Sequence, residues 1–245
     1  MIIWCLYDDG AMSYYQAIKQ YKKGVYSLHL GLQNKVIKSP NASYIKIDLS
    51  LNNPNLLEKL EQLPAPDIIL ASPPCESWSV ADGHSRQINL VDNEFKLNNY
   101  SFYQMYNKIM KPKRQRSFIQ KQTKRILGES TITQTINIIQ HFKPKIWIIE
   151  NPRNSLMWNY IESFLGFNGI KNKTYYSNYD LNFSQKPTIF YSNIELNLKY
   201  DFSIKGNKNF YNSGNYESRS KIPKDLIIDI IKQCQNKLEN YESSK

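Results

Sequence analysis

Two residues capable of covalent and acid–base chemistry directly follow apolar runs that are typical of buried strands. The first, Cys75, follows Ser72-Pro73-Pro74 at the end of the apolar run 67–71. Prolines fix the backbone and lack a donor N–H, so a thiol after two of them is presented in one direction. Such a thiol is a candidate nucleophile that its surroundings must activate, because free cysteine has a pKa of about 8.5. The alternative is an inert buried thiol.

Glu150 is the second such residue, and it ends the apolar run 146–149. A carboxylate in this position is costly to desolvate unless it is hydrogen-bonded or protonated, which is the state of a carboxyl group that donates a proton. The alternative is a capping or turn acid before Pro152. Perturbed carboxyl groups are typical of functional sites, so the position favours a catalytic role.

The elements that must position Cys75 and Glu150 are strands and helices that alternate along the sequence. Strands are expected over 2–7, 25–30, 44–49, 67–71, 146–149, 173–179 and 188–192, and helices over 13–21, 56–63, 130–141, 154–165 and 225–238. This order indicates an α/β fold, a mostly parallel sheet with helices on both faces. Ligands of such sheets gather at the carboxyl ends of the strands, where Cys75 and Glu150 should meet.

The composition is that of one globular domain, expected over 1–238 with a frayed tail over 239–245. The 245 residues are 41% hydrophobic, which is enough for one substantial core. The longest apolar runs fall far short of the roughly 20 residues that a membrane-spanning helix needs, so no membrane partner is expected. Met1 leads directly into a strand-like run without a readable secretory signal, which predicts a cytoplasmic protein.

Cysteine and histidine are few and widely spaced. The three cysteines, Cys5, Cys75 and Cys234, form no close pair, and the three histidines share no ligand-like spacing with them. This pattern argues against a disulfide framework and against a structural metal site. Cys5 and Cys234 lie inside apolar runs and are interpreted as inert core residues.

Positive charge is concentrated in an insertion over about 80–128. The net charge is +11, and no acid occurs between Glu94 and Glu129, where nine Lys and Arg residues lie among aromatic ones. Cations for phosphates and rings for stacking predict contact with nucleic acid. A solvated loop is the alternative. The candidate contacts in this segment are Lys111, Lys113, Arg114, Arg116, Lys121 and Arg125.

Two motifs together carry a resemblance to a known family. Ser72-Pro73-Pro74-Cys75-Glu76-Ser77-Trp78-Ser79 resembles the nucleophile motif of DNA cytosine-5 methyltransferases, in which Pro-Pro-Cys precedes Gln, any residue, Phe and Ser. Glu150-Asn151-Pro152 resembles their Glu-Asn-Val motif. The motif order is the family's own and covers most of the chain, and the small size and AT-rich codon signature indicate a phage or mobile-element member. The resemblance implies a Rossmann-like methyltransferase fold with a very small or absent target-recognition domain, here about 194–219.

The resemblance also implies S-adenosylmethionine as cofactor, S-adenosylhomocysteine as its product, and no metal. Tyr7-Asp8 and Gly10-Ala11 match the first motif, in which the usual pair of glycines is reduced to Gly10. Gly31 and Gln33 stand where the family holds an acid for the ribose, and Ser220-Lys221-Ile222-Pro223 leads the final helix as the last motif does. The implied cofactor contacts are Tyr7, Asp8, Gly10, Ala11, Asp48, which would contact the adenine amino group, and Pro73.

The implied catalytic residues are Cys75, Glu150, Lys186 and Thr188. Lys186 and Thr188 replace the two arginines of the family's Gln-x-Arg-x-Arg motif. In the implied reaction, Cys75 adds to C6 of a flipped cytosine and Glu150 binds N3 and the exocyclic amine. Ser79 and Arg153 complete the expected nucleic-acid contacts.

The expected partner is double-stranded DNA, and a recognition subunit or a cognate restriction enzyme is a further candidate. Two other interpretations stay open at this stage. One is a tRNA cytosine-5 methyltransferase, which the short recognition region permits. The other is a methyltransferase-fold DNA-binding protein with weak catalysis that needs a partner, which the altered first motif favours and the Cys75 and Glu150 pair opposes.

Overall fold

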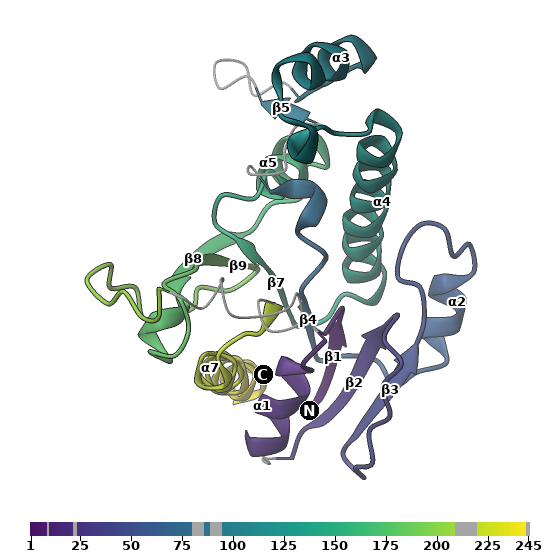
Figure 1. The fold of residues 1–245 in the computed structure, drawn as a ribbon. Helices are drawn as coiled ribbons and strands as arrows, with labels where there is room; N and C mark the ends of the chain where they lie inside the picture. The colour runs from purple at the N-terminus through teal and green to yellow at the C-terminus, as the bar shows by residue number, and fades with distance from the viewer. Residues whose placement is uncertain (9, 22–23, 80–85, 89–94, 209–219, 244–245) are drawn as a thin grey trace.

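The computed structural model describes residues 1–245 except 9, 22–23, 80–85, 89–94, 209–219 and 244–245. A seven-stranded sheet forms its centre (Figure 1), with the order β3-β2-β1-β4-β7-β9-β8. The strands are β1 (Ile2–Leu6), β2 (Tyr26–Gly31), β3 (Ala42–Lys46), β4 (Ile68–Ala71), β7 (Ile146–Pro152), β8 (Ile170–Tyr175) and β9 (Pro187–Ser192). The first five in this order run parallel, and β9 is antiparallel to both of its neighbours.

Helices cover both faces of the sheet, which explains why its central strands are continuously apolar. On one face, α1 (Ser13–Tyr21) and α7 (Lys224–Ser243) pack against alternate strand residues such as Ile3 and Ile148. On the other face, α2 (Leu56–Glu61), α4 (Phe118–Phe142) and α5 (Met157–Asn159) pack against the intervening ones. Each aliphatic side chain buried in these layers contributes about 1.5–3 kcal/mol to folding.

Strand β7 is longer than its apolar run predicts. It continues to Pro152 because β9 pairs with its second half, which places Glu150 opposite Phe190 and Pro152 opposite Thr188. Glu150 therefore lies inside a paired strand and is fixed by its backbone hydrogen bonds.

The basic insertion contains regular structure, although its sequence shows no clear period. It comprises the two-stranded β5 (Arg86–Ile88) and β6 (Phe95–Leu97), the helix α3 (Tyr100–Ile109), the 3₁₀ turn η2 (Pro112–Arg114) and the start of α4. Helix α4 begins at Phe118, twelve residues before the predicted start at 130. The Ser117 hydroxyl caps it by accepting a hydrogen bond from Gln120 N. Figure 1 shows α3 and the first half of α4 beyond the carboxyl ends of β1 and β4.

Three further predicted boundaries differ from the structure. Helix α7 continues to Ser243, so most of the segment expected to be a frayed tail is helical. The helix expected over 154–165 is reduced to α5 and one π-helical segment, η3 (Tyr160–Phe164), because Ser155 N bonds Pro152 O in a turn. The strand expected over 173–179 ends at Tyr175, where the 3₁₀ turn η4 (Tyr176–Asn178) begins.

The topology confirms the expected fold class. A mostly parallel sheet with helices on both faces, and one antiparallel strand inserted next to its edge, is an α/β Rossmann-like fold. In the part of the chain that the structure describes, no helix is both long and apolar enough to span a bilayer.

Candidate active site

The turn that carries Cys75 is held from strand β7. Cys75 follows β4 and precedes the 3₁₀ turn η1 (Glu76–Trp78), whose Trp78 is fully buried. Asn151 Nδ2 donates a hydrogen bond of 2.9 Å to Pro73 O, and Leu156 N donates one of 3.0 Å to Trp78 O. Cys75 itself is partly exposed. Its neighbours therefore fix the turn on both sides while Cys75 stays partly exposed.

Helix α4 packs unusually close to the same turn at Gly128. A Cβ atom added to Gly128 would lie 2.0 Å from Ser77 Oγ and 3.2 Å from Trp78 Nε1. Only glycine permits this approach of a helix to a neighbouring turn. The nucleophile turn is thus confined between β7 and α4.

The carboxyl group of Glu150 is buried, with 6% of the residue exposed, and is bonded through one oxygen. The Tyr176 hydroxyl donates a hydrogen bond of 2.9 Å to Glu150 Oε1, and Lys186 Nζ lies 3.9 Å from the same oxygen. The Lys186 ammonium also lies 4.5 Å from the centre of the Tyr176 ring. Glu150 Oε2 has no hydrogen-bond partner among the described residues. One oxygen is therefore anchored and the other is available to a ligand.

Two buried tyrosines complete the surroundings of Glu150. Burial, followed by the negative charge of Glu150, raises the pKa of both Tyr14 and Tyr176 well above the usual value. The Tyr14 hydroxyl shares a hydrogen bond of 2.7 Å with Ser72 Oγ, at the start of the nucleophile turn. Both phenols stay protonated as neutral hydrogen-bonding groups. Sequence reasoning missed both, because each resembles an ordinary core aromatic.

Cys75 lies within electrostatic range of both Lys186 and Glu150. Burial raises the pKa of the Cys75 thiol, the Lys186 ammonium lowers it, and Glu150 raises it. Lys186 therefore opposes the cost of forming a thiolate here. Thr188, the fourth expected catalytic residue, is fully buried, and its Oγ1 donates to Lys186 O over 3.2 Å. Thr188 therefore contacts the backbone of Lys186.

The loop between β1 and α1 adopts a strained turn where the resemblance places the first cofactor motif. Tyr7 and Met12 both have a φ of 57°, in the region that favours glycine. Asp8 is buried, and its carboxylate accepts hydrogen bonds from Tyr14 N, Tyr15 N and His29 Nδ1. The structure thus places Asp8 as an internal anchor for the first turn of α1 and for the loop.

Asp48 lies two residues beyond β3 with part of its carboxylate open. Oδ1 accepts a hydrogen bond of 2.9 Å from Ser50 N, and Oδ2 bonds no residue that the structure describes. The Tyr7 hydroxyl donates to the adjacent Leu49 O over 2.7 Å, which joins the β1 loop to this segment. The free oxygen fits a hydrogen-bond donor such as the amino group of an adenine.

The segment after β2 has no acid at the position where the resemblance places a ribose contact. A Cβ at Gly31 would lie 3.3 Å from the Tyr44 hydroxyl, which accepts a hydrogen bond of 2.8 Å from Gln33 N. Lys35 Nζ donates to Gly10 O over 2.6 Å and so ties this segment to the β1 loop. Residues 31–35 therefore include no acid that could contact a ribose.

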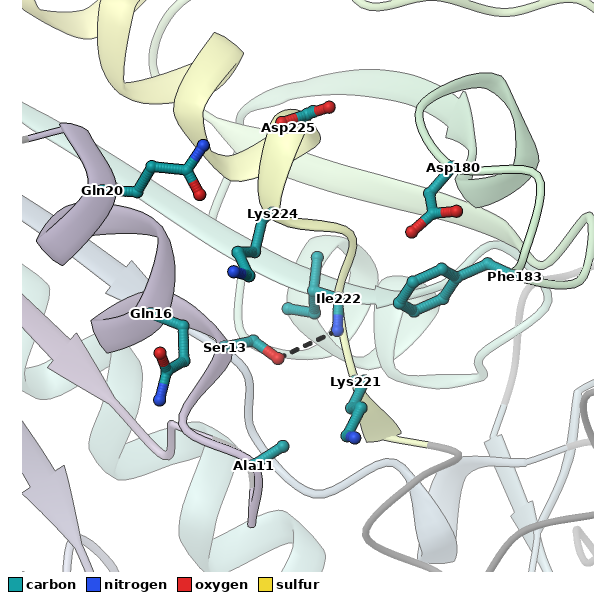
Figure 2. Close-up of a pocket in the computed structure, with 10 residues that line it drawn as sticks. All are labelled: Ala11, Ser13, Gln16, Gln20, Asp180, Phe183, Lys221, Ile222, Lys224 and Asp225. Carbon is teal, nitrogen blue, oxygen red and sulfur yellow. Dashed lines mark hydrogen bonds between the residues drawn. The ribbon is translucent and has the colours of Figure 1, made fainter.

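A cavity of about 500 Å³ lies beside the β1 loop, between α1 and the start of α7 (Figure 2). Ser13 Oγ accepts a hydrogen bond of 3.1 Å from Ile222 N across it. Of the expected site residues it contains Ala11, and it contains neither Cys75 nor Glu150. Its lining residues are Ala11, Ser13, Gln16, Gln20, Asp180, Phe183, Lys221, Ile222, Lys224 and Asp225. The cavity therefore adjoins the expected cofactor loop rather than the thiol.

The expected nucleic-acid contacts differ in exposure. Lys111, Lys113 and Arg114 are exposed on and beside η2, and Ser79 and Arg116 are half-buried. Lys121 is 8% exposed, and Arg125 NH1 lies 2.8 Å from Glu129 Oε2. The η2 turn thus presents the accessible cations of this set. Arg153, which directly follows β7, donates hydrogen bonds to Tyr175 and Tyr200.

Comparison with known proteins gives a match to solved structures and none to sequences. No family model matches the sequence, and no curated protein matches it either. Among solved structures, the chain is similar to a putative ribosomal RNA methyltransferase from Plasmodium falciparum. The identity is 14%, the TM-score is 0.38, and the match covers 78% of this chain and 84% of that one. Within the described residues, no group of three or more His, Cys, Asp or Glu residues could hold a metal ion.

Proposed function

We propose that this protein is an S-adenosylmethionine-dependent methyltransferase that methylates C5 of cytosine in DNA. The observation that supports this most is the hydrogen bond that joins β7 to the turn after β4. Asn151 bonds Pro73 O, two residues before Cys75, while its neighbour Glu150 lies within electrostatic range of the Cys75 thiol. A nucleophile and a carboxyl group held together in this way suit addition to a ring carbon.

Cys75 would add to C6 of the cytosine ring, and Glu150 would offset the negative charge that this addition creates at N3. The Cys75 thiolate forms a bond to C6, and the electron pair displaced from the C5–C6 bond makes C5 nucleophilic. Glu150 presents its free oxygen to N3 and the exocyclic amine, and a proton shared between this oxygen and N3 offsets the charge that develops there. After methyl transfer, the shared proton returns from N3 to Glu150, and loss of the C5 proton to a base breaks the C6–sulfur bond and returns the thiolate to Cys75.

Lys186 and Tyr176 would tune this pair. Lys186 favours the thiolate of Cys75, and its ammonium also faces Glu150 Oε1. The Tyr176 hydroxyl holds that oxygen in place, so Oε2 is the one presented to a base. Lys186 and Tyr176 thus hold Glu150 at Oε1, and Oε2 faces the base.

The cofactor would lie at the carboxyl ends of β1 and β3. When bound, S-adenosylmethionine supplies an electrophilic methyl group on sulfur and leaves as S-adenosylhomocysteine. Asp48 has a free carboxylate oxygen for the adenine amino group, and the Tyr7 hydroxyl joins the end of β1 to the adjacent Leu49. The missing acid after β2 predicts a modest affinity for the ribose.

The accessible cations on η2 would bind the phosphates of the DNA. They lie on the part of the chain that projects beyond the carboxyl ends of the central strands (Figure 1). A cytosine within a duplex must leave the stack to reach Cys75, at a cost of a few kcal/mol that phosphate contacts offset.

A covalent trap tests the proposal directly. We expect DNA containing 5-fluorocytosine to form a denaturation-resistant adduct with the protein in the presence of S-adenosylmethionine, because fluorine blocks the final loss from C5. Cys75→Ser should abolish the adduct, and Cys234→Ala, which changes a buried thiol in α7, should retain it.

The same protein should transfer a tritiated methyl group to duplex DNA as 5-methylcytosine. Transfer to RNA instead of DNA would move the assignment to an RNA cytosine-5 methyltransferase. DNA binding without transfer to either substrate would support the binding-protein interpretation. Methylation that survives Cys75→Ser, or that yields an amino-methylated base, would overturn the proposal.

A further inference from the structure

The aromatic rings of Tyr200 and Phe202 lie beside the ring of Tyr175, the residue before the Glu150 partner Tyr176. Tyr176 bonds Glu150, and its neighbour Tyr175 stacks on Tyr200 with ring centres 4.8 Å apart and planes at 5°. Phe202 lies 6.0 Å from Tyr175. Tyr175 is buried, whereas Tyr200 is 48% and Phe202 is 66% exposed. One ring is therefore covered and two are presented to solvent.

Arg153 links these rings to the candidate catalytic strand. It directly follows Glu150-Asn151-Pro152, and its NH1 donates to the hydroxyls of both Tyr175 and Tyr200, over 3.2 and 3.0 Å. Across the sheet, Pro152 pairs with Thr188 and Tyr175 pairs with Pro187. The rings thus lie at the end of the sheet where Lys186 approaches Glu150.

The irregular segment 199–206 that carries the exposed rings is held by side-chain hydrogen bonds to its backbone. Thr174 Oγ1 donates to Lys199 O, Ser177 Oγ to Ile204 O, and Gln185 Nε2 to Phe202 O, over 2.9, 2.6 and 2.7 Å. Asn178 exchanges two hydrogen bonds with the backbone of Asp201. A loop bound in this way presents its rings with little entropy left to lose on binding.

The charges around the rings suit a polyanion. Lys173, Lys199, Lys205 and Lys208 are exposed, and Lys205 Nζ lies 3.3 Å from the centre of the Phe202 ring. Asp201 is the acid of this segment, and its Oδ1 is bonded by Ser203 N and Oγ. Exposed rings with cations beside them are the arrangement by which proteins stack the bases and bind the backbone of single strands.

We infer that Tyr200 and Phe202 form a stacking platform for an unpaired nucleobase of the substrate strand, next to the base that enters the catalytic site. The inference rests on the proposed function for the position of that strand. Tyr200 offers its outer face, because Tyr175 covers the other, and Arg153 fixes the ring plane. The platform gives the short region after β9 a direct part in substrate binding.

Binding of fluorescein-labelled, mixed-sequence single-stranded DNA, followed by anisotropy over a range of salt, tests the platform. The double variant Tyr200→Ala/Phe202→Ala should lose about 10- to 100-fold in affinity, the effect expected for one stacked base. The slope of affinity against salt should not change, because phosphate contacts remain. Tyr200→Phe keeps the ring and should bind almost normally.

Phe164→Ala is the matched control, since Phe164 is also 66% exposed but lies on η3. Tyr200→Leu/Phe202→Leu keeps apolar volume without rings and should lose affinity like the alanine pair, which separates stacking from folding. Unchanged affinity in both double variants would overturn the platform. A wild-type protein that transfers no methyl group would overturn the proposed function alone, because the anisotropy comparison does not depend on transfer.

Discussion

Asn151 Nδ2 donates a hydrogen bond of 2.9 Å to Pro73 O, and both residues are buried. This bond joins the end of β7 to the turn after β4, and the two strands are neighbours in the sheet. Because Glu150 precedes Asn151 and Cys75 follows Pro73 by two residues, one amide group sets the relative position of the two candidate catalytic residues. Asn151 is therefore a positioning residue in the proposed site.

Asn151→Ala should release the nucleophile turn and leave the buried Pro73 carbonyl without a partner. We expect a loss of about 1–3 kcal/mol in the free energy of unfolding, measured by chemical denaturation. We also expect adduct formation with 5-fluorocytosine DNA to slow at least 10-fold while DNA affinity stays constant. Asn154→Ala, at an exposed position three residues later, is the control. Equal adduct rates in the two variants would contradict the positioning role.

Lys186→Met should make the Cys75 thiol harder to ionise. Burial already raises the pKa of this thiol and the Lys186 ammonium opposes that rise, so removing the charge must move the pKa further upward. Thiolate is the reactive form, so the rate of Cys75 alkylation by iodoacetamide should rise at higher pH than in the wild type. Lys186→Arg should restore most of the reactivity, and Lys59→Met, on α2, should not change it. A downward shift would disprove the assigned electrostatics.

Gly128→Ala tests the confinement of the nucleophile turn by α4. Alanine favours an exposed helix by about 1 kcal/mol over glycine, but here its Cβ would lie 2.0 Å from Ser77 Oγ. We expect a net loss of about 1–3 kcal/mol in unfolding free energy, as in overpacked cores, together with slower adduct formation. Adding Ser77→Gly removes the clashing atoms and should recover part of both losses. A stabilised single variant would show that the turn yields without cost.

The continuous apolar runs were sufficient to predict the central strands and the helices that cover them. Runs such as Ile68–Ala71 in β4 identify strands buried on both faces, which only a covered parallel sheet provides. The extent of β7 was not predictable in this way, because its last residues are held by pairing with β9, some 40 residues away. Long-range pairing leaves no local pattern in the sequence.

The start of α4 had a local signal that hydrophobic periodicity did not reveal. Ser117 and Gln120 have the spacing of a capping box, and the Ser117 hydroxyl does accept a hydrogen bond from Gln120 N. Its exposed first turns lack an apolar stripe, so a search for periodicity begins the helix at 130. The role of Tyr176 has no such signal, because it depends on the turn η4 directing the hydroxyl towards Glu150.

Glu150→Gln separates the acid–base role of Glu150 from its structural role. Glutamine keeps the shape and can still accept the Tyr176 hydroxyl at its amide oxygen, so we expect the melting temperature to change by no more than a few degrees. It cannot give a proton to N3, and methyl transfer should fall by about 10²- to 10⁴-fold. Tyr176→Phe, which removes only the anchoring hydroxyl, should cost far less, because Lys186 still faces Oε1. Transfer rates measured under single-turnover conditions on saturating DNA give the comparison. If the two variants lose activity equally, Glu150 orients the base without moving a proton, and the acid must be sought elsewhere in the site.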